Sequence, residues 1–172
     1  MKKIIVGIAV VASAIIAGCK PTVEQMKTTS IAIGYAAGLV ANETGIDDSS
    51  RNAVINILNE VVACVPEQGQ SYRDAWTPVI KAKVAELIEA GKINQEAGEI
   101  ITTVATLAAE GVDYLFNVRF PEAKKYSELV SAGVSGCIEG FLSAFKPINS
   151  KSEIEYVEYD KKAYAYFKRA FK

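Results

Sequence analysis

Apolar residues recur at intervals of three and four through most of the chain after residue 22. This spacing is typical of amphipathic helices that bury one face. The first stripe follows a capping box that Thr22 and Gln25 can form, and it ends near Gly45. A second stripe can start at Asp48, and it ends at Pro66 because proline cannot continue a helix. The chain is therefore predicted to begin its folded part with two helices.

Two further helices are predicted in the middle of the chain. Thr77 followed by Pro78 is typical of an N-cap and a first helical position, and the stripe that follows ends at Gly91. A single turn over residues 73–76 can precede this third helix. Asn94 can cap a fourth helix, because its side chain can accept a hydrogen bond from a free backbone N–H.

The last third of the chain carries two more helical patterns. Pro121 opens a fifth helix and Pro147 ends it, while Ser152 and Glu155 can form a capping box for a sixth. Strand signals are weak in comparison, and no Asn-Gly or Asp-Gly hairpin turn occurs. We therefore expect an all-α fold, a bundle of five to six helices joined by short loops.

Small residues form a second pattern on the predicted first and fifth helices, and each set includes a four-residue spacing. The residues are Gly34, Gly38, Gly133, Gly136 and Gly140. In a bilayer such spacing marks a dimerisation face, but these segments are too short or too charged to span one. We therefore expect the glycines to let two helices pack closely inside the bundle.

The N-terminus has a different pattern. Lys2 and Lys3 precede about fifteen uncharged, mostly apolar residues, and this run ends in Ile16-Ala17-Gly18-Cys19. The layout is that of a secretory signal peptide, and its end resembles the signal of bacterial lipoproteins. The resemblance implies cleavage before Cys19 and attachment of lipid to its thiol, so that Cys19 becomes the mature N-terminus. It covers only the first 19 positions and implies no activity.

Two other interpretations of this segment are possible. A membrane-spanning helix needs about 20 apolar residues, and this run is shorter. An ordinary secretory signal would leave Cys19 as a free or paired thiol. Under the lipoprotein interpretation, residues 1–18 are the signal peptide and residues 19–22 are a lipidated tether. Residues 22–147 then form the bundle domain, and residues 148–172 form a C-terminal helix.

The lipid would hold the mature chain on a membrane of the bacterial cell envelope, because several acyl chains together anchor stably. Lys20 follows the cysteine. In enteric bacteria this class uses Asp at that position to stay on the inner membrane, so the resemblance favours the outer membrane in a Gram-negative host.

Composition narrows the classes of function. The chain holds 19 basic and 20 acidic residues, and Lys2 and Lys3 leave with the signal peptide, so the mature chain is acidic. An acidic, exported chain argues against nucleic-acid binding. There is no histidine, which removes imidazole bases and the commonest ligand of zinc, iron and copper. We expect no cofactor and no metal site.

Two patterns in the sequence involve reactive cysteine or serine side chains. Cys64 and Cys137 lie on the second and fifth apolar stripes, and in an oxidising compartment we expect them to form a disulfide across the bundle. The alternative is two buried free thiols that act as small apolar residues. Ser143 and Lys146 match the Ser-x-x-Lys pattern of penicillin-recognising acylases, but the accompanying elements are missing, and we interpret the match as a coincidence.

Carboxylates also share helix faces, as Glu110 and Asp113 do. Carboxylate-bridged metal sites in helical bundles use Glu-x-x-His, which this chain cannot supply. A glycosidase would need two acids that face each other across a cleft. Solvated helix surface is the simpler interpretation of these pairs.

The C-terminal helix is basic, aromatic and amphipathic. Its candidate contact residues are Lys161, Lys162, Tyr164, Phe167, Lys168 and Arg169. Such a helix can lie on an anionic lipid surface, dock in the groove of a partner, or cover its own bundle with its lysines outward.

Two functions from different classes remain. The first is a membrane-anchored, non-catalytic envelope lipoprotein that binds or shields another envelope component, as an adaptor, pilot or receptor-blocking protein does. The expected partners are the membrane, through Cys19, and an envelope protein. The alternative is a histidine-free envelope hydrolase or wall-modifying enzyme.

Overall fold

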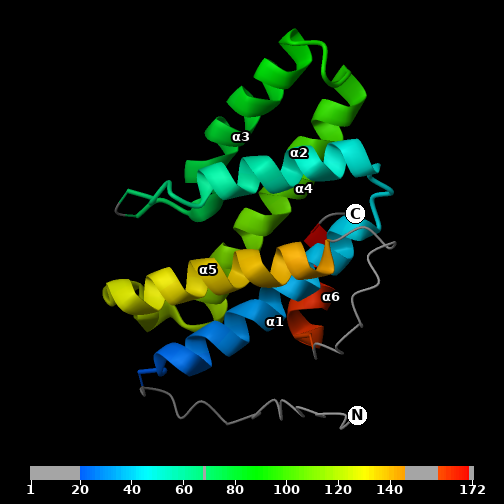
Figure 1. The fold of residues 1–172 in the computed structure, drawn as a ribbon. Coiled ribbons are helices and arrows are strands. Elements are labelled where there is room, and N and C mark those ends of the chain that lie inside the picture. The colour runs from blue at the N-terminus through cyan, green and yellow to red at the C-terminus, as the bar shows by residue number, and fades with distance from the viewer. Residues whose placement is uncertain (1–19, 68, 146–158, 171–172) are drawn as a thin grey trace, which may run out of the picture.

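The computed structural model describes residues 20–67, 69–145 and 159–170. In these residues the chain forms α-helices and two shorter helical segments, with no strand (Figure 1). The α-helices are α1 (Val23–Asn42), α2 (Asp48–Val61), α3 (Tyr72–Glu89), α4 (Gln95–Tyr114), α5 (Ser127–Ala144) and α6 (Lys161–Ala170). The shorter segments are the π-helical turn η1 (Leu115–Arg119) and the 3₁₀ turn η2 (Pro121–Lys125). The predicted all-α bundle of five to six helices is confirmed.

Two predicted helix starts are confirmed in detail. Thr22 Oγ1 accepts a hydrogen bond from the Gln25 N–H at 3.1 Å, and Gln25 Oε1 accepts one from the Thr22 N–H at 3.0 Å, which completes the capping box of α1. The Asn94 side chain caps α4. The cap of α2 is Asp47, one residue before the predicted start at Asp48. Caps that use nearby side chains are thus visible in the sequence.

The predicted start of the third helix was wrong. Helix α3 begins at Tyr72, with Ser71 as its N-cap, and Pro78 lies inside the helix. Thr77 is therefore an interior residue and not a cap. The first backbone N–H groups of α3 are held by Asp113, a residue of α4. The Ser71 hydroxyl accepts a hydrogen bond from the Asp74 N–H at 3.0 Å, which is a local cap that neighbouring residues show, whereas the support from Asp113 cannot be recognised from them.

The fifth and sixth helices also begin later than predicted. Pro121 opens η2, and α5 follows from Ser127. The sixth helix begins at Lys161, after Asp160, whose Oδ1 accepts hydrogen bonds from the N–H groups of Lys162 at 2.9 Å and Ala163 at 3.1 Å. The predicted helix end at Pro147 and the capping box of Ser152 and Glu155 lie outside the described residues.

Helices α1 and α5 form the most extensive contact between elements, and they run parallel, side by side (Figure 1). A Cβ atom added at Gly34 would lie 1.9 Å from the Cys137 carbonyl oxygen, and one at Gly38 would lie 2.5 Å from that of Phe141. On α5, a Cβ atom at Gly140 would lie 2.1 Å from the Ile31 carbonyl oxygen. The prediction that these glycines allow close packing is confirmed.

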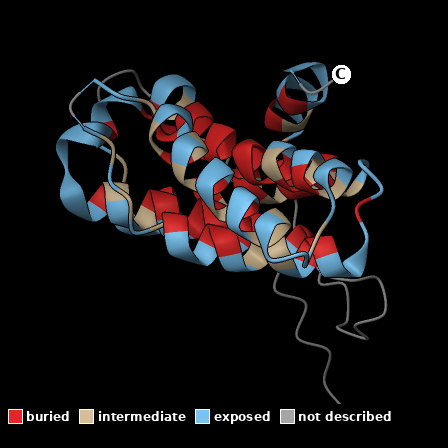
Figure 2. Ribbon diagram, turned by 90° about the horizontal axis from the view of Figure 1, so that it is seen from above, coloured by how far each residue is buried: buried red, intermediate tan, exposed pale blue. Residues whose placement is uncertain are grey.

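Helix α4 is the central element, because it contacts each of the other five α-helices. Every residue from Val104 to Phe116 is buried. Figure 2 shows the buried residues on the sides of the helices that face one another, with exposed residues outside. Small residues such as Ala105, Ala109 and Gly111 make this possible, since they let neighbours approach α4 from several directions.

Arg51 joins the ends of three helices. It is 7 % exposed, and its Nη1 donates hydrogen bonds to the Phe145 carbonyl at 2.6 Å and to Asn42 Oδ1 at 2.7 Å. Asn42 in turn donates to the Ala144 carbonyl at 2.6 Å. The guanidinium also lies over the Phe145 ring, 4.5 Å from its centre. The C-terminal ends of α1 and α5 are thereby fixed to the start of α2.

The predicted disulfide between Cys64 and Cys137 was wrong, because both residues are free thiols. Cys137 lies on α5, where its Sγ donates to the Gly111 carbonyl of α4 at 3.8 Å. Cys64 follows the end of α2, and its carbonyl accepts a hydrogen bond from Trp76 Nε1 at 2.9 Å. The two residues therefore pack against different neighbours. Burial raises the pKa of the Cys137 thiol, so it stays protonated and unreactive.

No helix in the described part of the chain has the length and apolar character needed to cross a membrane.

Candidate functional site

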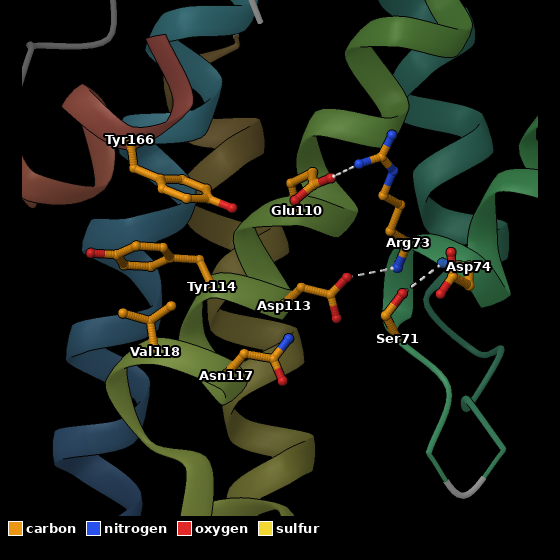
Figure 3. Close-up of a pocket in the computed structure, with 9 residues that line it drawn as sticks. All are labelled: Ser71, Arg73, Asp74, Glu110, Asp113, Tyr114, Asn117, Val118 and Tyr166. Atoms are coloured by element: carbon orange, nitrogen blue, oxygen red, sulfur yellow. Dashed lines mark hydrogen bonds and ion pairs between the residues drawn. The ribbon is translucent and has the colours of Figure 1, made fainter. Parts of the chain in front are cut away.

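A concave site lies where the start of α3 meets the end of α4 and the side of α6 (Figure 3). Its volume is about 410 Å³. The lining is mostly polar and comprises Ser71, Arg73, Asp74, Glu110, Asp113, Tyr114, Asn117, Val118 and Tyr166. Three carboxylates, two phenols and one guanidinium thus meet in one pocket, so the pocket is the first place to look for catalytic groups.

Asp113 holds the start of α3. Its Oδ1 accepts a hydrogen bond from the Tyr72 N–H at 2.8 Å, and its Oδ2 accepts one from the Arg73 N–H at 2.9 Å. The carboxylate is 8 % exposed. Both oxygens are therefore engaged with backbone groups that have no partner within α3. The negative charge also lies at the positive end of the helix dipole, where it is stabilised.

Glu110 is paired in the same way, one turn earlier on α4. Its Oε1 lies 2.6 Å from Arg73 Nη1, and its side chain is 11 % exposed, whereas that of Arg73 is 59 % exposed. Figure 3 shows the two side chains directed toward each other across the pocket wall. The arginine neutralises an acid that would otherwise be buried without a partner.

The interpretation of Glu110 and Asp113 as solvated helix surface was therefore wrong. Both residues are buried, and both hold α3 against α4. The three-residue spacing showed that they share a face, but nothing in it showed that the face meets α3. A signal was present in the apolar run around them, since polar residues in such a run are buried and need partners.

Two tyrosines form the opposite wall of the pocket. The ring centres of Tyr114 and Tyr166 lie 5.0 Å apart, and Tyr114 also packs against Phe167 at 5.7 Å. Burial, together with the charge of Asp160, raises the pKa of the Tyr114 phenol. Burial and the charge of Asp113 raise the pKa of the neighbouring Tyr72 to about 12. These phenols are protonated at neutral pH and can donate hydrogen bonds but cannot act as bases.

Helix α6 packs on the bundle through its apolar side, as the third of the possibilities above proposed. Phe167 is fully buried, and Asp160, just before the helix, donates its N–H to the Ala32 carbonyl at 3.4 Å. Tyr164 donates its hydroxyl to Glu43, and Lys168 Nζ lies 3.3 Å from Glu43 Oε2. The hydrogen bond from Tyr164 and then the one from Lys168 lower the pKa of Glu43.

The remaining cations of α6 point away from the bundle. Lys161, Lys162 and Arg169 are exposed, and within the described residues none of them forms an ion pair. Of the six predicted contact residues, these three are free to meet another molecule. Phe167 is inside the core, and Tyr164 and Lys168 are engaged with Glu43.

Cys19 lies outside the described residues, which begin at the next position. Lys20 Nζ lies 2.9 Å from Glu128 Oε1 and 3.9 Å from the centre of the Tyr126 ring. These contacts fix Lys20 to the start of α5, beside the first turn of α1. The sequence did not predict them, because residues 20 and 128 are distant along the chain.

In the described residues no group of three or more His, Cys, Asp or Glu side chains could hold a metal ion. Comparison of the chain with family models, with curated proteins and with solved structures gives no match.

Proposed function

We propose that the chain is a membrane-anchored lipoprotein of the bacterial cell envelope, and that its bundle binds or shields another envelope component without catalysing a reaction. The observation that carries this proposal is the sequence Ile16-Ala17-Gly18-Cys19 at the end of an apolar run, followed within four residues by the first helix. A Lys at position 20 favours the outer membrane in a Gram-negative host.

The pocket supports binding over catalysis. A hydrolase that works with carboxylates uses a pair of them, one as proton donor and one as base or nucleophile. Of the three acids in the pocket, Glu110 and Asp113 are engaged with Arg73 and with the backbone of α3, which leaves the exposed Asp74 without a second free carboxylate beside it in the lining. Ser143 is exposed on α5, and its hydroxyl donates to the Glu139 carbonyl of the same helix. Its sequence partner Lys146 lies outside the described residues.

The outer face of α6 is the surface we propose for the partner. Lys161, Lys162 and Arg169 place three positive charges on one short helix of an otherwise acidic chain. Charges of one sign gathered on one face favour a partner that carries the opposite sign. The partner is therefore expected to present an acidic surface.

The first experiment tests the anchor. The protein is purified from a bacterial membrane, and the mass of its N-terminal peptide is measured. A peptide that begins at Cys19 and carries acyl chains is expected, and a Cys19→Ser variant should lose both the lipid and the membrane association. An unmodified thiol at Cys19 would refute the anchor.

The second experiment tests the binding surface. A photocrosslinking amino acid is placed at Lys162 on α6, and a matched control is placed at Lys81, an exposed lysine on α3. A discrete adduct from position 162, absent from position 81 and lost in Cys19→Ser, is expected in the native host. Equal labelling from both positions, or none from either, would contradict a partner on α6. Turnover of cell-wall fragments by the purified protein would favour the hydrolase instead.

A further inference from the structure

We infer that the bundle stands on its membrane through one end, the end formed by the start of α1, the turns η1 and η2, and the start of α5. This inference rests on the proposed lipid on Cys19. This end is the surface of the protein that meets the bilayer. The other faces of the bundle therefore remain free for a partner. The surface that this end contacts is that of the bilayer in which the lipid of Cys19 is inserted.

The segment that connects Cys19 to α1 is short. Only Lys20, Pro21 and Thr22 separate Cys19 from the first residue of α1. A fully extended chain spans at most about 3.6 Å per residue, so three residues reach about 11 Å. The headgroup layer on each side of a bilayer is about 5 to 8 Å thick. An anchor at Cys19 therefore holds the start of α1 within or next to the headgroups.

The connection is also held to the bundle. Lys20 pairs with Glu128 at 2.9 Å, and its ammonium group lies over the Tyr126 ring. Thr22 is fixed as the cap of α1. Because α1 and α5 run parallel, the starts of both helices lie at the same end of the molecule (Figure 1). The anchor is therefore next to two helix starts and not to one.

Exposed apolar side chains are concentrated at the same end of the bundle. Five large apolar side chains are exposed in the described residues, and three of them belong to the elements at this end. They are Val23 at the start of α1 with 47 % exposure, Val118 in η1 with 57 %, and Tyr126 before α5 with 39 %. Tyrosine and apolar residues beside lysines are the composition that favours the membrane interface.

The charged side chains at this end are largely paired with one another or with neighbouring residues. Lys20, Lys27 and Lys125 each pair with a glutamate and Arg119 lies 3.8 Å from Asp160, while Lys124 contacts the neutral Asn117. The end therefore carries no strong excess of positive charge. Contact is expected with phosphatidylcholine vesicles, and anionic lipid is not required for it.

The test compares tryptophans at opposite ends of α4. Tyr126→Trp lies at this end, and Lys92→Trp, also at an exposed residue, lies in the turn between α3 and α4, about 30 Å away along α4 (Figure 1). The single native tryptophan, Trp76, is fully buried in α3 and supplies a common background. Each lipidated variant is placed in phosphatidylcholine vesicles that carry brominated lipid. Loss of emission is expected for Tyr126→Trp beyond the Trp76 background, and none beyond it for Lys92→Trp.

A spacer variant tests the cause. A flexible Gly-Ser segment of ten residues inserted between Lys20 and Pro21 has an average span of about 17 Å, which frees the bundle from the headgroups. The excess quenching of Tyr126→Trp should then fall, while the circular dichroism spectrum stays unchanged. Equal quenching at both positions, or stronger quenching at Lys92→Trp, would show that the bundle does not stand on this end and would overturn the inference.

The two proposals fail in different ways. The mass of the N-terminal peptide is measured on each vesicle sample. An unmodified Cys19 refutes the anchor and this inference with it. A lipidated Cys19 together with no excess quenching at Tyr126→Trp leaves the anchor intact and refutes the end-on contact alone.

Discussion

Helices α1 and α5 pack closely because glycines at their contact have no side chain. A side chain at Gly34 would overlap the Cys137 carbonyl group, since the added Cβ would lie 1.9 Å from its oxygen. Backbone atoms cannot move aside as the end of a flexible side chain can. Each glycine lowers helix propensity by about 1 kcal/mol relative to alanine, so the close contact must compensate this loss.

Gly34→Ala is therefore expected to destabilise the protein by about 2 kcal/mol or more, because overpacking a rigid site forces the backbones apart. Gly111→Ala is the matched control, since its added Cβ would meet only the Ala37 Cβ at an ordinary 3.7 Å. This second change should be neutral or stabilising, because alanine favours a helix over glycine. Urea unfolding of the two variants measures the difference. Similar stabilities would contradict the close packing of α1 and α5.

Asp113→Asn tests the cap that α4 supplies to α3. An amide has one acceptor oxygen in place of two, so one N–H of Tyr72 or Arg73 would lose its partner. The free energy of unfolding is expected to fall by about 1 to 3 kcal/mol. Glu99→Gln, an exposed change on the same helix, should alter it by less than about 0.5 kcal/mol. Equal effects in urea unfolding would show that Asp113 is not a cap.

At the scale of elements, the sequence predicts a helix start when its cap lies within a few residues. The capping box of Thr22 and Gln25 is found as predicted, because both partners belong to one turn. Helix α3 begins six residues before Pro78, with Ser71 as its local cap and Asp113 supporting it from a position about 40 residues away. The number and apolar faces of the helices were thus predictable, and Ser71 was a local signal for the start of α3, while the support from Asp113 was not predictable.

The same limit applies to the candidate site. The sequence predicted an amphipathic C-terminal helix, and packing on its own bundle with the lysines outward was one of three possibilities for it; Lys161, Lys162 and Arg169 are exposed. It did not predict that Lys168 meets Glu43, since the contact depends on how α6 docks against α1. Periodicity places a residue on a face, whereas its partner follows only from the packing of that face.

Docking of α6 is expected to weaken in acid. The hydrogen bonds from Tyr164 and Lys168 lower the pKa of Glu43 below its ordinary 4.5, so the folded state favours the carboxylate. This stabilisation is present above pH 4.5 and is lost as the pH falls through the lowered pKa. Tyrosine ring signals in nuclear magnetic resonance should report release of α6 in that range. In Glu43→Gln, which cannot ionise, this change of the tyrosine signals with pH should disappear. A change that persists would show that another group causes it.

At the scale of the whole molecule, α4 connects two groups of helices. Its later half packs against α1 and α5, and α2 and α3 contact it as well. Because Val104 to Phe116 are buried throughout, neither group can lose α4 without exposing its own core. Arg51 adds a second link, since it joins α2 to the ends of α1 and α5. This arrangement favours unfolding of both groups together.

Two natural probes test this cooperativity, one in each group. Trp76 is the only tryptophan and lies fully buried in α3, and Cys137 is buried between α5 and α4. Urea should change Trp76 fluorescence and expose the Cys137 thiol to labelling at the same midpoint. In Arg51→Lys, which cannot keep both the Phe145 and Asn42 hydrogen bonds in the same geometry, both midpoints should fall together. If Trp76 responded at lower urea than Cys137, α2 and α3 would unfold as a separate unit, and the shared helix α4 would not couple the two groups.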